Sequence, residues 1–310
     1  MRLLAKYTNH TGFIDNNLFR FSQPKSLNDF REALPEVLFS GYSDEDWAVA
    51  YADAASVGLD GAPRSTIEAL FLASCPAHRY DEESFPGLWP MSEPRLRAEP
   101  FSKISEFDQA ISERVVELYN NYANENFAIF SLSSKLISEP MWAYYGGSHS
   151  GLQVRFWQDH LFFRDRSHPV QYSDEPVRVS NQGGMLRICG QRISIEEALD
   201  RKIEEAIKSN GFPLAILLRK KIDWQHEEEV RLLRMVSEAV RSDSIDKFGN
   251  RVFLFEIPSQ AIHSIVIGYD AGKEFIDEII GKVKSSDRWG NIEIYRRVRG
   301  LIGVLEERIL

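Results

Sequence analysis

The prediction of a central sheet starts from Phe127-Ala-Ile-Phe-Ser-Leu-Ser133, an apolar stretch that only two serines interrupt. A short apolar run of this kind predicts a buried β-strand. Side chains alternate between the two faces of a strand, so Ser131 and Ser133 are expected on the same face. Buried hydroxyl groups need hydrogen-bond partners. A bound ligand is one such partner, and backbone groups or the cap of the next helix are the alternative.

The rest of the chain alternates between helical and strand-like patterns. Apolar residues at helical spacing predict a helix over 105–125, directly before the central strand. Further helices are predicted within 32–75 and at 140–145, 194–209 and 271–284. Strands are predicted at 3–7, 18–22, 152–157, 169–172, 214–218, 230–233, 252–257, 262–267 and, as the last one, 292–295. Five prolines within 76–100 predict an extended surface loop. We therefore expect an α+β fold: a single domain over residues 1–310 with mixed or antiparallel central sheets and a mostly helical insertion at about 32–125.

Composition narrows the classes of function. The 310-residue chain carries 37 basic and 46 acidic residues, a net charge of −9. This balance disfavours an extended nucleic-acid-binding face, which normally needs a basic surplus. No stretch approaches the ~20 apolar residues of a membrane-spanning helix, so we expect no membrane contact and a cytoplasmic protein. Cys75 and Cys189 are interpreted as two reduced thiols.

Several common catalytic motifs are missing from the sequence. There is no glycine-rich phosphate loop and no dinucleotide-binding glycine pattern. None of the seven histidines pairs with another at the spacing of metal ligands. We therefore expect no metal site and no tightly bound cofactor.

The densest polar cluster is Asp223-Trp-Gln-His-Glu-Glu-Glu-Val-Arg231. If its second half is extended, Glu227, Glu229 and Arg231 share one face of a strand. A Glu-x-Glu pair of this kind can hold a ribose hydroxyl with one carboxylate and stabilise positive charge at an anomeric carbon with the other. The alternative is a solvated helix start, in which Glu227 and Arg231 form an ordinary ion pair four residues apart.

Two other segments are candidates for ligand contacts. Trp142 and Tyr145 are three residues apart on a predicted helix, and they can hold an aromatic ring such as nicotinamide between them; core aromatics are the alternative. Lys6 and Tyr7 lie on the first strand, where Lys6 can meet a phosphate group.

Taken in chain order, these segments resemble a family of bacterial proteins, the domain-of-unknown-function family 2971. The resemblance rests on Lys6-Tyr7, Phe21-Ser22-x-Pro24-x-Ser26-Leu27-Asn28-Asp29, Phe130-Ser131-Leu132-Ser133, Met141-Trp142-Ala143-Tyr144-Tyr145 with Gly151, Trp224-x-x-Glu227-x-Glu229-x-Arg231, and Ile257-Pro258 to Ile265-Val266-Ile267-Gly268. It spans residues 3 to about 296. Phe30 stands where the family usually has proline, and 40–125 matches no named segment.

A more distant resemblance is to ADP-ribosyltransferases, which carry a basic residue on the first strand, Ser-x-Ser on a middle strand and a late Glu-x-Glu. This resemblance implies an ADP-ribosyltransferase-like core and NAD as a possible substrate. It also implies a link to bacterial anti-phage defence, as a toxin or effector that modifies an unidentified acceptor macromolecule or binds a protein partner.

Our first hypothesis is accordingly an ADP-ribosyltransferase-like or NAD-glycohydrolase-like enzyme. In it, Glu229 stabilises the transition state, Glu227 positions the acceptor, and Ser131 and Ser133 shape the ribose site. Trp142 or Tyr145 stacks on nicotinamide, Tyr7 lines the site, and Lys6 or Arg231 neutralises the pyrophosphate. The second hypothesis is a nucleotide-binding sensor of a defence system without catalysis. A metal nuclease that uses the acidic run is a third.

Overall fold

The computed structural model describes residues 2–27, 32–33, 35–40, 48, 51–52, 54–63, 66–67, 102–175, 177–182, 185–188, 191–194, 205, 211–290, 292–301 and 303–310. The chain divides into two compact units. Unit 1 consists of Met1–Glu32, Ala123–Asp174 and Leu218–Leu310, and unit 2 of Ala33–Tyr122 and Glu175–Leu217. The first segment of unit 2 overlaps the insertion predicted at about 32–125, and the second lies outside it.

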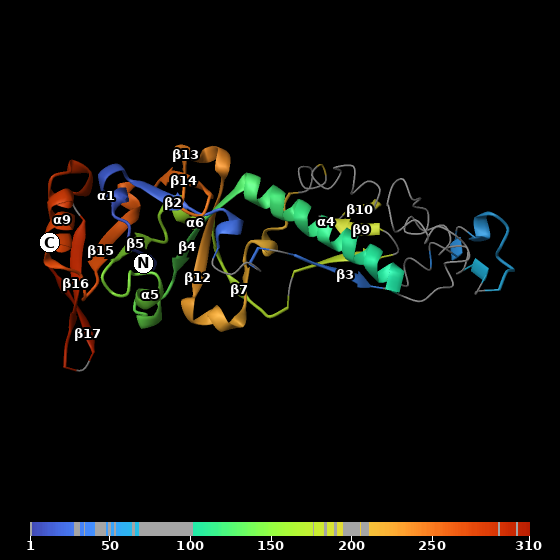
Figure 1. Cartoon of the computed structure of the whole chain (residues 1–310), viewed down its shortest axis with the longest axis horizontal. Helices are drawn as coiled ribbons and strands as arrows, with labels where there is room; N and C mark the ends of the chain where they lie inside the picture. Colours follow the sequence, from blue (N-terminus) through green and yellow to red (C-terminus); the bar gives the residue numbers. More distant parts are fainter. Residues whose placement is uncertain are drawn as a thin grey trace. The chain divides into compact units, whose positions relative to one another are not determined.

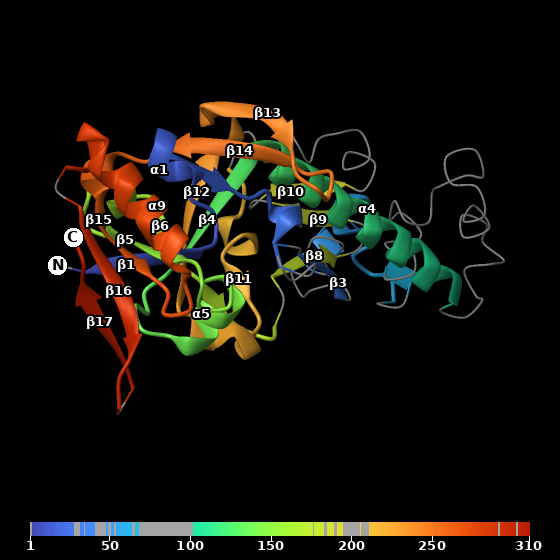
Figure 2. The same ribbon diagram turned by 60° about the vertical axis from the view of Figure 1, so that its left-hand side comes forward.

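Unit 1 is built on an eight-stranded sheet (Figures 1 and 2). Its strands, in spatial order, are β17 (Val304–Arg308), β16 (Glu293–Arg299), β15 (Ile262–Ile267), β5 (Leu152–Trp157), β1 (Leu3–Thr8), β4 (Phe127–Ser133), β12 (Glu229–Met235) and β6 (Ser167–Pro169). All neighbouring strands are antiparallel except β15 and β16. The mixture of strands and helices confirms the predicted α+β class.

Each face of this sheet has its own hydrophobic cluster, as alternation along the strands requires. Leu4, Phe130 and Leu132 belong to the larger cluster, which also takes residues from α1 (Gly12–Asn16), α9 (Lys273–Lys284) and the small sheet β13 (Arg241–Ile245), β14 (Arg251–Glu256) and β2 (Leu18–Phe21). Ala5 and Tyr7 belong to the smaller cluster, which takes Met141 and Trp142 from α5 (Glu139–Tyr144). The position of α5 therefore marks the face that carries Tyr7.

The sheet is open between β1 and β4. Strand β1 pairs with β5 along its whole length, and β4 pairs with β12 along its whole length. Between β1 and β4 there is only one pair, Ala5 with Ser133. Further along β4, Ile129 exchanges backbone hydrogen bonds with Ser22. Ser131 lies between these two contacts, and its backbone points into the opening because strand hydrogen bonding repeats every two residues.

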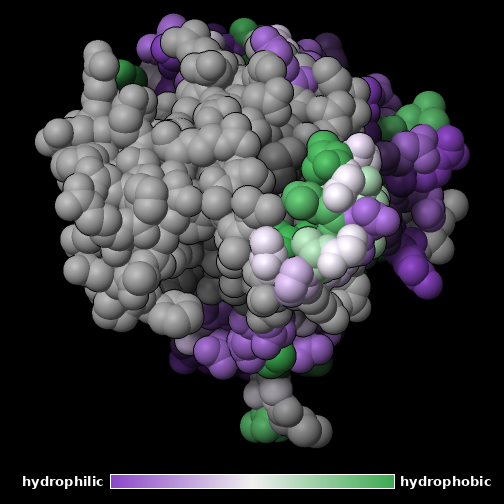
Figure 3. All heavy atoms as spheres, turned by 90° about the vertical axis from the view of Figure 1, so that its right-hand side faces the viewer, coloured by the Kyte–Doolittle hydropathy of each residue, from purple (hydrophilic) through white to green (hydrophobic). Residues whose placement is uncertain are grey.

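Unit 2 contains a four-stranded sheet of β10 (Gln191–Ser194), β9 (Met185–Ile188), β8 (Arg178–Gln182) and β3 (Glu36–Ser40). It also contains most of α4 (Ser102–Asn126), on which Tyr122 stacks against Phe212 with ring centroids 5.8 Å apart. On the face shown in Figure 3, hydrophilic and hydrophobic side chains of described residues are mixed.

Several predicted elements are confirmed, and several are wrong. The strands at 127–133, 152–157 and 262–267 and the helix at 105–125 are present. Residues 36–40 are a strand rather than part of a helix, 214–216 form a 3₁₀ turn rather than a strand, and β17 follows the strand expected to be last. The loop at 76–100, both cysteines and nearly all of the helix predicted at 194–209 lie outside the described residues.

The described part of the chain lacks two further features. None of its helices combines the length and the apolar character that crossing a bilayer requires. It likewise contains no group of three or more histidine, cysteine, aspartate or glutamate side chains arranged to hold a metal ion.

Candidate functional site

A cavity of about 190 Å³ lies at the opening between β1 and β4, within unit 1. Its walls include Lys6 and Tyr7 from β1, Ser131 from β4, Tyr145 after α5, and Lys220, Glu227 and Glu229. Of the predicted site residues, the structure thus brings together Lys6, Tyr7, Ser131, Tyr145, Glu227 and Glu229. Strand order explains the assembly, because β1, β4 and β12 are neighbours in one sheet.

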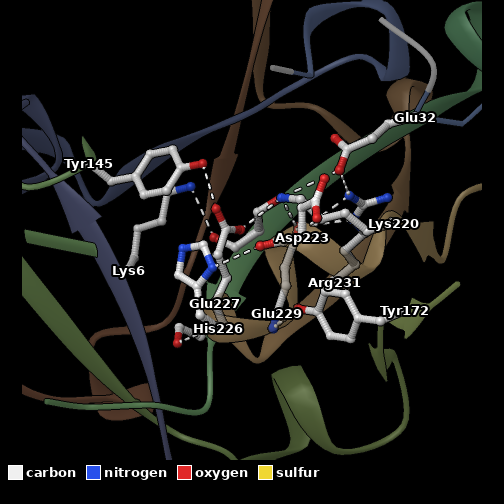
Figure 4. A network of polar contacts seen from close by, with 12 residues as sticks. Lys6, Glu32, Tyr145, Tyr172, Lys220, Asp223, His226, Glu227, Glu229 and Arg231 are labelled. Carbon is white, nitrogen blue, oxygen red and sulfur yellow. Dashed lines mark hydrogen bonds and ion pairs between the residues drawn. The ribbon is translucent and has the colours of Figure 1, made fainter. Parts of the chain in front are cut away.

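Lys220 is the centre of a buried ion cluster at this cavity, drawn in Figure 4. It belongs to β11 (Arg219–Lys220), which pairs with β7 (Gln171–Tyr172). Its ammonium group lies 2.7 Å from a carboxylate oxygen of Glu227, 3.0 Å from one of Glu229 and 3.3 Å from one of Glu32. Only 6% of the Lys220 side chain is exposed. Burial alone would lower the pKa of Lys220, but the three carboxyl groups raise it above its ordinary value.

Glu229 is held from two sides. Arg231 donates from Nε to Oε1 at 2.9 Å and from Nη2 to Oε2 at 3.3 Å, and Lys220 donates to Oε2. Burial opposes ionisation of Glu229, but the charges of Arg231 and Lys220 and a hydrogen bond from Ser131 lower its pKa to about 2. Glu229 is therefore an ionised carboxylate whose two oxygens are both engaged.

Glu227 reaches the same cavity from a different backbone position. It ends the 3₁₀ helix η6 (Ile222–Glu227), and Glu228 follows in the left-handed region with a φ of 44°. The prediction that Glu227 and Glu229 lie side by side holds, since both contact Lys220. The backbone kink at Glu228, and not a continuous strand, brings them together. The Tyr145 hydroxyl donates to Glu227 Oε1 at 2.8 Å. Glu227 is thus bound by one charged donor and one neutral donor.

Lys6 approaches the cavity from the sheet face opposite to Tyr7. Its ammonium group donates to the backbone carbonyl of Ser131 at 2.9 Å, across the opening, and lies 5.1 Å from the centre of the Phe130 ring. Figure 4 shows Lys6 and Tyr145 pointing toward the Glu227 carboxylate. Lys6 therefore closes the gap that backbone pairing leaves, while its amine faces the cavity.

Three predicted ligand contacts lie in the wall behind the cavity rather than on its surface. Ser133 is buried and donates to the Glu227 carbonyl at 2.6 Å, which is the backbone partner that was the alternative for its hydroxyl. Trp142 is buried against Tyr7 and under the Arg297 guanidinium, as a core aromatic. Arg231 is fully buried and bound to Glu229 and Glu32.

Tyr7 is almost fully buried, and its hydroxyl donates to the carbonyls of Lys135 and Leu136 at 3.0 and 3.1 Å. Burial raises the pKa of Tyr7 to about 12. The hydroxyl therefore stays protonated and tethers the 135–136 loop, so Tyr7 contributes shape to the cavity rather than a reactive group.

Sequence reasoning missed three members of the site. Lys220 belongs to the basic pair that precedes the acidic run, so the residues that it joins are only seven and nine positions away. Glu32 begins the range in which helices are predicted, but nothing in the local sequence indicates its distant partners; burial raises its pKa, while Arg231 and Lys220 oppose this. Tyr172 accepts the Glu229 backbone N–H at 2.7 Å and so helps fix the start of β12. Asn28 and Asp29 lie outside the described residues.

The comparisons with known proteins give one match. Residues 141–232 match the family described as "Protein of unknown function (DUF2971)", so the resemblance predicted from the sequence is confirmed over that segment. The segment runs from α5 to β12 and includes Lys220, Glu227 and Glu229. Searches of curated proteins and of solved structures found no match.

Proposed function

We propose that this chain cleaves the N-glycosidic bond of an NAD-like nucleotide, as an NAD glycohydrolase or an ADP-ribosyltransferase-like enzyme. One observation carries the proposal: Lys6, Ser131, Glu227 and Glu229, from three neighbouring strands and the turn before one of them, line one polar cavity. Cleavage of this bond leaves positive charge at the anomeric carbon of the ribose. A fixed carboxylate near that carbon lowers the barrier.

The contacts favour Glu227, rather than Glu229, as the carboxylate that faces the anomeric carbon. Glu229 is already neutralised by a guanidinium and an ammonium group, so it has little negative charge to offer a ligand. Glu227 shares one ammonium group and takes its other hydrogen bond from the neutral Tyr145 hydroxyl. A ribose hydroxyl can replace that neutral donor at small cost, because one neutral hydrogen bond is exchanged for another.

The size of the cavity limits which part of the substrate enters it. Pockets for drug-sized ligands have volumes of roughly 300–1,000 Å³, and this cavity has about 190 Å³. It suits the nicotinamide riboside end of the nucleotide, with the phosphates outside. Arg231 is enclosed by carboxylates, so of the two cations considered for the pyrophosphate only Lys6 remains available.

The test measures free nicotinamide released from NAD by the full chain. Glu227→Gln preserves the shape of the side chain and removes its charge, so the rate should fall by about 10²–10³. The matched control is Glu306→Gln, which removes a carboxylate bound to Arg155 in the same sheet and should leave the rate unchanged. Unaltered turnover by Glu227→Gln, or no nicotinamide release by the natural chain, would reject the proposal.

A second candidate function is ligand sensing without catalysis, and one observation favours it. Glu227 and Glu229, two of the three carboxylates that line the cavity, already have partners within the chain at both oxygens. A sensor would show a higher melting temperature with NAD but release no nicotinamide. The two functions are therefore separated by measuring both quantities on the same sample.

A further inference from the structure

The proposed N-glycosidic step gives the amine of Lys6 at most a charge contact with the pyrophosphate, and no bond-forming role. This amine lies in the opening of the sheet, where it donates a hydrogen bond to the Ser131 carbonyl and lies over the Phe130 ring. No carboxylate of the described residues lies within ion-pair distance of it, in contrast to Lys220, which has three. The cavity therefore presents two lysines with opposite surroundings.

The pKa values of the two lysines are shifted in opposite directions. Burial lowers the pKa of Lys6 to about 8, Glu229 and Glu227 act in the opposite direction, and Arg20 and Lys220 lower it further. The carboxylates instead raise the pKa of Lys220 above its ordinary value. Lys220 is thus a permanent cation, while Lys6 is an amine with an appreciable neutral fraction near neutral pH.

We propose that Lys6 is a nucleophilic amine that forms a reversible imine with a small hydroxy-aldehyde bound in the cavity. The aldehyde carbon would lie at the sheet opening, next to Nζ. The neighbouring hydroxyl groups would bind Glu227 and Tyr145, which line the same cavity. This activity goes beyond the proposed function, although the ribose freed by N-glycosidic cleavage is, in its open form, a hydroxy-aldehyde of this class.

The reaction needs no oxidant or reductant. The lone pair of Nζ forms a bond to the carbonyl carbon, and the carbonyl π electrons move to the oxygen, which takes up a proton. The nitrogen then loses a proton, the hydroxyl group is protonated and leaves as water, and the C=N bond forms. One water is released for each imine. The Tyr145 hydroxyl, bound to Glu227, can supply the proton for the departing water.

The test uses the full chain with D-glyceraldehyde and cyanoborohydride, which reduces an imine to a stable secondary amine. Mass spectrometry of the digested chain then gives the labelling rate at each lysine. Lys273, an exposed residue at the start of α9, is the internal reference. At pH 7.5 an amine of pKa about 8 has about 10²-fold more neutral form than an ordinary lysine. We expect at least about tenfold faster labelling at Lys6 than at Lys273.

The pH profile separates reactivity from mere accessibility. Labelling of Lys6 should reach half its maximum near pH 8, about two pH units below the midpoint of an ordinary lysine side chain. Equal or slower labelling at Lys6, or a Lys6 profile that follows Lys273, overturns the proposal. The comparison is made within one folded chain and without NAD, so it needs no Lys6 variant and holds even if no nicotinamide is released.

Discussion

Replacing Lys220 by methionine tests the buried ion cluster directly. Methionine keeps most of the length of the side chain and removes the charge that three carboxyl groups share, at 2.7, 3.0 and 3.3 Å. Removing one partner from a buried ion pair typically costs 3–5 kcal/mol, because the remaining charges are left uncompensated. We therefore expect Lys220→Met to lower the free energy of unfolding by about 3–5 kcal/mol. A typical domain has roughly 5–15 kcal/mol in total.

The assay is urea unfolding at pH 7, with circular dichroism as the measure of the folded fraction. Lys282→Met is the matched control, since Lys282 also contacts two carboxylates at 3.0 Å, but with 31% of its side chain exposed. Exposed pairs contribute about 0–1 kcal/mol, so the control should stay within that range. A loss below about 1 kcal/mol for Lys220→Met would refute the reasoning, because the carboxylates would then not depend on Lys220.

The same cluster predicts a specific rescue. If Lys220→Met acts through unpaired charge, adding Glu229→Gln removes one of the stranded carboxylates. The double variant should then lose less than the sum of the two single variants, since residues in one ion network couple by about 0.5–3 kcal/mol. Simple additivity would instead indicate that the loss comes from packing of the methionine.

The remaining predictions concern pH, the cavity and the backbone. The pKa of Glu229 is lowered from 4.5 to about 2 in the folded chain, so its ionised form stabilises the fold above pH 4.5, and this contribution, on the order of 3 kcal/mol, is lost as the pH falls toward 2. Urea unfolding of the natural chain at pH 5 and pH 2.5 should show this loss when it is compared with Glu229→Gln. A stability difference between the two chains that does not change with pH would contradict the prediction. Tyr145→Phe removes a donor from a buried carboxylate and should cost about 1–3 kcal/mol in thermal unfolding, whereas no change would mean that the hydroxyl is not needed there. A Cβ on Gly268 would lie 1.9 Å from the His149 carbonyl oxygen, so Gly268→Ala should destabilise the chain by at least about 1–3 kcal/mol, while Gly281→Ala, in a helix with open space around it, should be neutral or stabilising; equal melting temperatures for the two would argue against the close approach.

The central strands were predictable from the sequence because their signal is local. Strand β5 begins directly after Gly151, strand β15 ends directly before Gly268, both are rich in apolar residues, and both have the predicted bounds. The run at 214–218 is equally apolar, yet it follows Pro213 and forms a 3₁₀ turn, an ambiguity that short apolar runs always carry. Strand β17 was missed because its residues are mostly charged. Its charged side chains form ion pairs with other strands of the sheet, Glu306 with Arg155 and Arg308 with Glu293, and only the fold brings these partners together.

The candidate site was predictable only in part, for a similar reason. Alternation along a strand predicted that Glu227 and Glu229 act together, but the left-handed Glu228 that aligns them is a feature of the turn and not of the pattern. Trp142 is a residue type that often contacts aromatic ligands, but its surroundings are those of a core residue. It packs against Tyr7, more than 100 positions away, and sequence spacing contains no information on that contact.

The cavity itself follows from a conflict between two sequence signals on β1. Leu4 and Lys6 alternate onto the same face of the strand, and that face covers the main hydrophobic cluster. The amine of a lysine at this position needs either a hydrogen-bond partner or contact with solvent. Lys6 donates to the Ser131 carbonyl, and this bond replaces the backbone pair that Tyr7 and Ser131 would otherwise form. The opening between β1 and β4 is then stable, since Ala5–Ser133 and Ser22–Ile129 fix it on both sides. A charged residue on the apolar face of a central strand thus both opens the sheet and places an amine in the opening.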